Sequence, residues 1–141
     1  MPRVYRARIT VLGYEIDAFG ELYPSTLARF LQQVAVEASA DAGFPDAWYA
    51  ETGTIWLIRR STIEYLGPAR AGDVLEIATQ VADFRRVRSR REYEVRRLPG
   101  GERIAVAHSD WVYVDRTTGR LARIPPGMIE AFLAGGEPKA L

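Results

Sequence analysis

The segment from Leu12 to Gly43, LGYEIDAFGELYPSTLARFLQQVAVEASADAG, decides the fold. It contains the end of a predicted strand, a short loop with the carboxylate of Asp17, and a long apolar helix. Pro24 suits the first helical turn and Gly43 suits the helix end. The predicted helix over 24–42 would be roughly 28 Å long at about 1.5 Å per residue. Apolar residues recur with the spacing of one buried helical face: Leu27, Phe30, Leu31, Val34, Ala35, Ala38 and Ala42.

The rest of the chain predicts five strands. Residues 5–12 alternate apolar and polar side chains, which is typical of a half-buried strand. A short terminal helix is expected within 124–133, and one helical turn after Pro45. Four further strands, rich in β-branched and aromatic residues, are expected at 55–66, 74–84, 87–98 and 104–115. Turn-forming residues at 67–73 separate the first two of these strands, and those at 99–101 separate the last two.

This order of elements favours an antiparallel sheet. Each neighbouring pair of parallel strands needs a crossover, usually a helix, and the chain offers one long helix before four strands. We therefore predict an α+β fold in which the four later strands form a meander and the sheet curls round the helix. One sheet covers so apolar a helix only in part, so we expect an isologous homodimer, or a homotetramer built from it. With no repeat and no linker, residues 1–141 are expected to form a single domain.

Composition narrows the class of protein. A chain of 141 residues with 48% hydrophobic content can bury a substantial core, and the lack of cysteine excludes disulfides and thiolate metal sites. No signal peptide or bilayer-spanning run is recognised, which predicts a cytoplasmic protein with no membrane partner. A net charge of +1 argues against a nucleic-acid partner. Lys139 is the only lysine, and the many arginines suit anionic groups such as phosphate.

Three segments resemble the hot-dog-fold thioesterases, in particular the 4-hydroxybenzoyl-CoA thioesterase branch and, within it, bacterial acyl-carrier-protein (ACP) thioesterases. Residues 14–20 (YEIDAFG) look like the family's strand-end loop, in which an Asp is followed by a Gly three residues on. Residues 67–73 (GPARAGD) look like its "P…GD" turn. Residues 111–115 (WVYVD), followed by Arg123-Ile124-Pro125, look like its last strand and exit. The resemblance implies a five-stranded antiparallel sheet wrapped round one long central helix, and hydrolysis of an acyl-CoA or acyl-ACP thioester.

The resemblance also implies a site. It gives Asp17 the role of nucleophile or general base, and the backbone N–H of Tyr23, just before the proline at the helix start, the role of polarising the thioester carbonyl. The chemistry agrees, because thioester hydrolysis needs an attacking group and donors aimed at the developing oxyanion, and a helix N-terminus has unpaired N–H groups. Gly20 would bind substrate. Glu21 stands in the run Glu-Leu-Tyr-Pro that replaces the family's His-Val-Asn-Asn, and is a second candidate carboxylate.

No cofactor is expected beyond the CoA or phosphopantetheine that forms part of the substrate. Two interpretations of the arginines between positions 85 and 97 remain open. They form an exposed, salt-bridged strand face, or they dock the phosphates of CoA or the acidic surface of a carrier protein. The best docking candidates lie near the expected hairpin joint: Arg85, Arg86 and Arg88.

Other side chains are weighed as alternatives. Glu37 falls off the apolar helical stripe, which favours a solvated or interface position. His108 and Ser109 are consecutive in a strand and point to opposite faces, so they cannot form a triad. A lone histidine cannot build a metal site, so no metal is expected. Three aromatic residues are either core or the lining of an acyl pocket: Trp48, Tyr49 and Trp56.

The expected function is hydrolysis of an acyl thioester to a free acid and a thiol. One alternative is a non-catalytic domain that binds acyl-CoA or acyl-ACP, which the missing polar run after Gly20 favours. The other is a hydratase or isomerase on the same fold, which is disfavoured because no histidine accompanies a carboxylate near the helix start.

Overall fold

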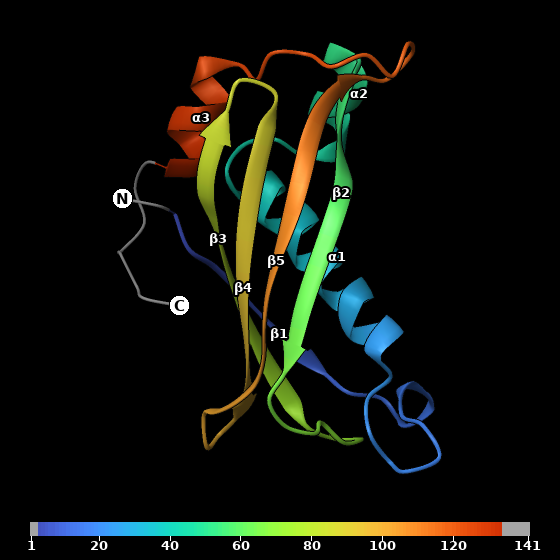
Figure 1. Ribbon diagram of the computed structural model, residues 1–141. Coiled ribbons are helices and arrows are strands. Elements are labelled where there is room, and N and C mark those ends of the chain that lie inside the picture. The colour runs from blue at the N-terminus through green and yellow to red at the C-terminus, as the bar shows by residue number, and fades with distance from the viewer. Residues whose placement is uncertain (1–2, 134–141) are drawn as a thin grey trace.

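The computed structural model describes residues 3–133. Five strands form one antiparallel sheet in the order β1-β3-β4-β5-β2, and the long helix α1 lies across one of its faces (Figure 1). The α+β class, with a five-stranded antiparallel sheet around one long helix, is confirmed. The elements in chain order are β1 (Tyr5–Thr10), the 3-10 turn η1 (Gly13–Glu15), α1 (Pro24–Asp41), α2 (Asp46–Thr52), β2 (Thr54–Tyr65), β3 (Val74–Arg85), β4 (Arg88–Leu98), β5 (Glu102–Asp115) and α3 (Pro126–Leu133).

The strand order corrects the predicted meander. β3, β4 and β5 follow one another as neighbours, but β2 pairs with β5 at the far edge, from Thr54↔Asp115 to Tyr65↔Ala105. A two-residue loop would have forced β2 and β3 to pair, whereas the segment 66–73 is long enough to cross beneath the sheet. The single turn expected after Pro45 is also longer than predicted, since α2 has seven residues.

α1 forms as its apolar spacing predicts. Its buried face differs from the expected one only at the end, where Ser39 is buried and Ala42 is the C-cap. Gly43 follows in the left-handed region (φ 104°), which ends the helix at little steric cost. Neither α1 nor any other helix in the described part of the chain is long and apolar enough to cross a membrane.

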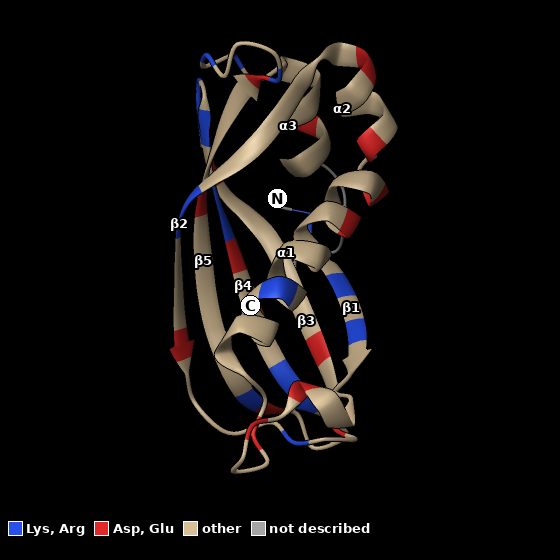
Figure 2. Ribbon diagram, turned by 90° about the vertical axis from the view of Figure 1, so that its right-hand side faces the viewer, with Lys and Arg blue, Asp and Glu red and all other residues tan. Residues whose placement is uncertain are grey.

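The core has two parts, one at each end of the sheet. The larger part lies beneath the first half of α1 and includes Leu27, Phe30, Leu75 and Ile77. The smaller part lies where α2 and α3 gather at the C-terminal end of α1 (Figure 2), and its buried members are Tyr49, Val81, Tyr113, Ile124, Met128 and Phe132. This division leaves hollows along α1.

Candidate functional site

The loop before α1 holds the Asp17 side chain through backbone groups. The Asp17 N–H donates to the Glu21 carbonyl (2.7 Å), and the Gly20 N–H donates to the Asp17 carbonyl (3.0 Å). This turn places Gly20 at φ 78°, where other residues are strained. The Asp17 Oδ1 accepts the N–H groups of Phe19 (2.8 Å) and Glu21 (3.1 Å), while Oδ2 accepts none from residues 3–133. One carboxylate oxygen therefore positions the side chain and the other is free for chemistry.

A buried glutamate ties this loop to the helix. Glu15 is 5% exposed, and its carboxylate accepts the Leu12 N–H (2.8 Å) and pairs with the Arg29 guanidinium on α1 (3.0 Å). The Leu22 N–H donates to the Ala69 carbonyl (2.8 Å), which fixes the far side of the loop to the segment after β2. Sequence reasoning missed Glu15, although its position three residues after Leu12 is the spacing of a capping box.

The structure qualifies the predicted role of Tyr23. Its N–H donates to the Glu15 carbonyl (3.1 Å) and is therefore occupied. Pro24 has no N–H, so within residues 3–133 the Ser25 N–H is the first amide of α1 without a backbone acceptor. The sequence Pro24-Ser25 at the helix start could have predicted this donor, because a proline at the first helical position leaves the N–H of the second residue as the first unpaired one.

The loop opens onto a cleft of about 400 Å³. Asp17 and Glu21 line it together with the start of α1, so the structure brings these two carboxylates and the helix terminus into one place. The opposite wall is apolar and exposed, with Tyr65 at 50% and Leu66 at 44%. The cleft thus combines a positioned carboxylate with a surface suited to a hydrocarbon.

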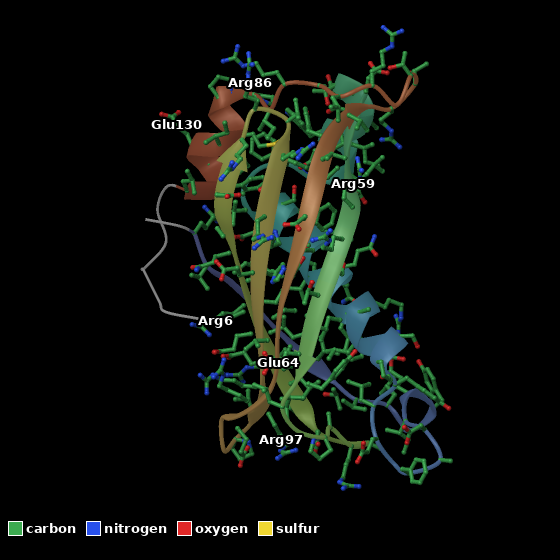
Figure 3. All side chains as sticks on the ribbon, in the orientation of Figure 1. Arg6, Arg59, Glu64, Arg86, Arg97 and Glu130 are labelled. Atoms are coloured by element: carbon green, nitrogen blue, oxygen red, sulfur yellow. The ribbon has the colours of Figure 1, made fainter. Side chains whose placement is uncertain are left out.

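Arg85, Arg86 and Arg88 lie far from this cleft. They surround the β3–β4 turn, at the opposite end of the sheet from the Asp17 loop (Figure 3, where Arg86 is labelled). β3 connects the two ends, and its twelve residues span roughly 36 Å at about 3.3 Å per residue. Within one chain, these arginines and Asp17 do not form one site.

The arginines of β4 divide between the two interpretations. Three of them form ion pairs, with carboxylates of β5, of β4 itself and of the turn before β3: Arg90–Asp110 (2.7 Å), Arg96–Glu94 (2.7 Å) and Arg97–Asp73 (3.7 Å). The Arg90 hydrogen bond holds the pKa of Asp110 below its ordinary value. Arg85 and Arg88 are exposed and line a depression of about 580 Å³ with Arg59 and Arg60. Arginines outnumber carboxylates in this depression, so its net charge is positive and suits an anionic partner.

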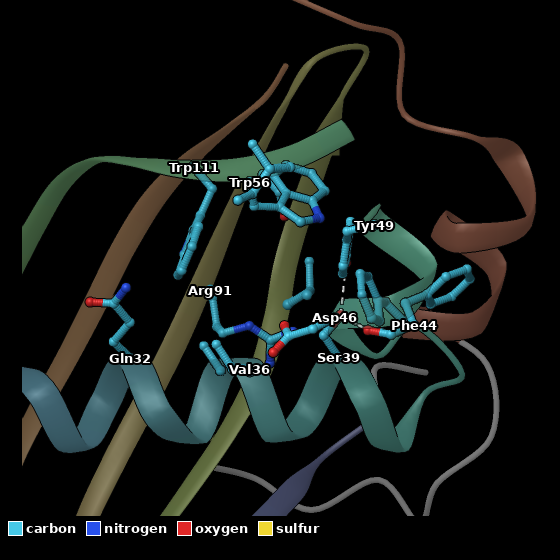
Figure 4. A pocket seen from close by; sticks show the side chains of 14 residues that line it. Gln32, Val36, Ser39, Phe44, Asp46, Tyr49, Trp56, Arg91 and Trp111 are labelled. Atoms are coloured by element: carbon cyan, nitrogen blue, oxygen red, sulfur yellow. Dashed lines mark hydrogen bonds between the residues drawn. The ribbon is translucent and has the colours of Figure 1, made fainter. Parts of the chain in front are cut away.

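A separate cavity of about 170 Å³ lies between the C-terminal half of α1, α2 and the sheet (Figure 4). Tyr49 and Trp56 line it, and the Trp56 ring lies 5.0 Å from that of Tyr113. Trp48 instead packs edge-on against Phe44, with ring centroids 4.8 Å apart. Two of the three aromatic residues considered for a pocket therefore line one, although it is not the cleft of Asp17.

Ser109 is buried and hydrogen-bonded to the Tyr93 hydroxyl (2.8 Å), whereas His108 pairs across the strands with Thr62 and Glu92, and no hydrogen bond joins His108 to Ser109 in the described chain. Glu37 was expected at a solvated or interface position, and the structure contradicts the solvated one. It is half-buried, and its Oε2 is buried without a hydrogen-bond partner in the region 3–133, because the helix side beside the stripe also packs against the protein.

Comparison with known proteins identifies relatives of the whole described fold. The family model "Acyl-ACP thioesterase N-terminal domain" matches residues 2–132. The chain is 28% identical over 144 residues to the chloroplastic palmitoyl-acyl carrier protein thioesterase of Arabidopsis thaliana, an alignment that covers 96% of this chain and 35% of the relative. The chain spans about a third of the length of such curated plant relatives.

Two solved structures show the same fold. An acyl-ACP thioesterase from Bacteroides thetaiotaomicron superposes with a TM-score of 0.83 at 20% identity, over 98% of this chain and 56% of that one. The 4-hydroxybenzoyl-CoA thioesterase from Pseudomonas sp. strain CBS-3 superposes with a TM-score of 0.85 at 21% identity, over 92% and 99%. The resemblance to hot-dog-fold thioesterases is confirmed.

Proposed function

Because this chain belongs to the acyl-ACP thioesterase family, we propose that it hydrolyses an acyl thioester of CoA or of an acyl carrier protein to a free acid and a thiol. The observation that carries this proposal is the state of Asp17. Two backbone N–H groups hold its Oδ1, its Oδ2 accepts no hydrogen bond within residues 3–133, and its side chain lines a cleft at the start of α1. A carboxylate positioned in this way is suited to attack or to proton abstraction.

Two routes use the free oxygen of Asp17. In the first, Oδ2 attacks the thioester carbon, the C–S bond breaks as the thiolate leaves, and water then hydrolyses the mixed anhydride. In the second, Oδ2 takes a proton from a water molecule that attacks the same carbon, and the thiolate is protonated as it leaves. Both routes yield the acid and the thiol, and both need donors for the carbonyl oxygen.

For those donors we propose the first amides of α1. The Ser25 N–H has no backbone acceptor in the described part of the chain, whereas the Tyr23 N–H has to give up its bond to the Glu15 carbonyl before it can polarise a thioester. Gly20 takes the left-handed conformation (φ 78°) that the turn between Asp17 and Glu21 requires, and Glu21 lines the cleft as a second carboxylate. The substrate itself would bring CoA or phosphopantetheine, and the proposal requires no further cofactor.

The test is thiol release from short, long and aromatic acyl-CoAs and from the corresponding acyl-ACPs. We expect at least one class to release thiol well above the rate without protein, and the rate to rise in proportion to protein concentration. Tight binding of acyl thioesters without release would contradict hydrolysis and support the non-catalytic binding domain. Conversion of enoyl or hydroxyacyl groups without free thiol would support a hydratase or isomerase.

We also propose that the chain forms at least a homodimer through β2. Within residues 3–133, this strand of twelve residues pairs with β5 alone, so its other edge offers unpaired backbone groups there. Leu57 and Ile58 of this strand are 46% and 37% exposed. A second copy would also explain the separated arginines, since Arg85 and Arg88 of one chain could bind the phosphates of a substrate held at Asp17 of the other.

Light scattering with size-exclusion chromatography should therefore give at least twice the 15.8 kDa of one chain. Replacing Ile58 by Pro should shift the mass toward one chain, because proline removes a donor from the exposed edge strand. The control is the wild-type protein measured at the same concentrations, with circular dichroism of both proteins to show that the variant keeps its fold. A wild-type monomer at the concentrations used for activity would contradict the proposal.

A further inference from the structure

Arg91 on β4 is a buried cation that has no carboxylate partner among the residues that the structure describes. It is 7% exposed, and its guanidinium has one hydrogen bond, to the Thr79 hydroxyl at 3.3 Å. It lies 5.7 Å above the ring centroid of Phe132. Among residues 3–133, no carboxylate approaches it within ion-pairing distance, and burial lowers its pKa. A guanidinium has five N–H donors, so most of its capacity is unused.

The neighbouring polar groups are, by contrast, satisfied. The Ser39 hydroxyl bonds to the Phe44 carbonyl (2.8 Å) and to the Tyr49 hydroxyl (2.7 Å). The Ser89 hydroxyl bonds to the Asp83 carbonyl (3.1 Å). An unpaired buried charge is strongly unfavourable, whereas its neighbours show that the fold can satisfy polar groups here. The exception at Arg91 therefore indicates an anionic partner that is not part of the described chain.

Arg91 faces the cavity of about 170 Å³ between α1 and the sheet (Figure 4). Its walls include Val36, Trp56, Trp111 and Phe132, and the carboxylate of Asp46 lies on the lining from α2 without bonding to Arg91. A cavity of about 150 Å³ can hold a benzene molecule, so this one has room for a group of about that size. An apolar segment ending in a small anion would fit both its walls and its charge.

The cavity continues the direction of the Asp17 cleft along α1. Leu27 lines the cleft, Leu31 and Gln32 line a narrow hollow of about 20 Å³, and Gln32 and Ser39 line the Arg91 cavity. From Leu27 to Ser39 the helix rises roughly 18 Å. An acyl chain attached at the Asp17 end and laid along α1 would therefore point its distal end toward Arg91.

We propose that Arg91 binds a carboxylate at the distal end of the acyl group, so that the preferred substrates are monothioesters of dicarboxylic acids. The planar fork of a guanidinium matches a carboxylate in two parallel hydrogen bonds. This inference rests on the proposed function for the thioester end of the ligand, whereas the carboxylate site rests on Arg91 itself.

The test measures binding of thioether analogues of acyl-CoA, which cannot be hydrolysed. Analogues of increasing chain length are compared in pairs that end in a methyl group or in a carboxylate. For the chain length that reaches the cavity, calorimetry should show that wild type binds the analogue ending in a carboxylate at least about tenfold more tightly than the analogue ending in a methyl group. Arg91→Met should reverse this preference, Arg91→Lys should retain part of it, and Arg8→Met, which alters an exposed arginine on β1, should match wild type.

Three results would overturn the proposal. The first is the absence of a carboxylate preference at every chain length, and the second is a preference that persists in Arg91→Met. The third is a lower melting temperature of ligand-free Arg91→Met, because replacing an arginine kept for binding with an apolar side chain should raise stability. The analogues are not hydrolysed, so a protein that releases no thiol could still show the carboxylate preference, and only the proposed hydrolysis would then fail. Thiol release without a carboxylate preference would overturn the Arg91 site and leave the proposed hydrolysis intact.

Discussion

Asp17→Asn should lower kcat by about a hundredfold or more, with KM and the fold little changed. The substitution preserves side-chain size and an oxygen that can accept the N–H groups of Phe19 and Glu21, so the turn should persist. It replaces the free oxygen with an amide that can neither attack a thioester nor take a proton from water. The measurement is steady-state thiol release with the best substrate of the panel, together with circular dichroism of both proteins.

The matched control is Glu130→Gln, which makes the same change of charge on an exposed carboxylate of α3, at the opposite end of the sheet from the Asp17 loop (Figure 3). It should leave kcat within about twofold, because surface substitutions away from a site have small effects. Glu21→Gln tests the second carboxylate of the cleft. Full activity in Asp17→Asn combined with a large loss in Glu21→Gln would contradict the assignment and give the role to Glu21.

Phe30→Ala should lower the free energy of unfolding by about 3–5 kcal/mol. Phe30 is 3% exposed and lies in the larger core with Leu75 and Ile77, where α1 packs on the sheet. Truncation removes buried apolar area and leaves a cavity that the rigid strands cannot fill. Urea denaturation at a fixed protein concentration should show a lower midpoint with an unchanged m value.

Gln33→Ala provides the comparison on the same helix. The Gln33 side chain is exposed, so the substitution should change the free energy of unfolding by no more than about 0.5 kcal/mol. A loss of less than about 1 kcal/mol for Phe30→Ala would contradict the packing of α1 on the sheet, because a buried phenylalanine cannot be removed from a close-packed core at so small a cost.

Local sequence was sufficient to predict the helices and strands and the loop that carries Asp17. The spacing from Leu27 to Ala38 predicted α1 because helical residues three and four apart share one face, whatever that face packs against. The proximity of Asp17, Gly20 and Glu21 to Pro24 followed in the same way, because these residues are neighbours along the chain. Short turns also predicted the β3–β4 and β4–β5 pairs.

Tertiary structure alone decided which distant residues meet. It paired β2 with β5 rather than β3, separated Arg85 from Asp17 by the length of the sheet, and buried Arg91 between α1 and β4. The alternation of Tyr93 and Val95 with charged residues hinted that Arg91 shares their inner face, but charges occupy both faces of β4. The reason is physical: periodicity and turn chemistry act between near neighbours, whereas strand order and burial depend on free energies that arise only once distant segments are packed together.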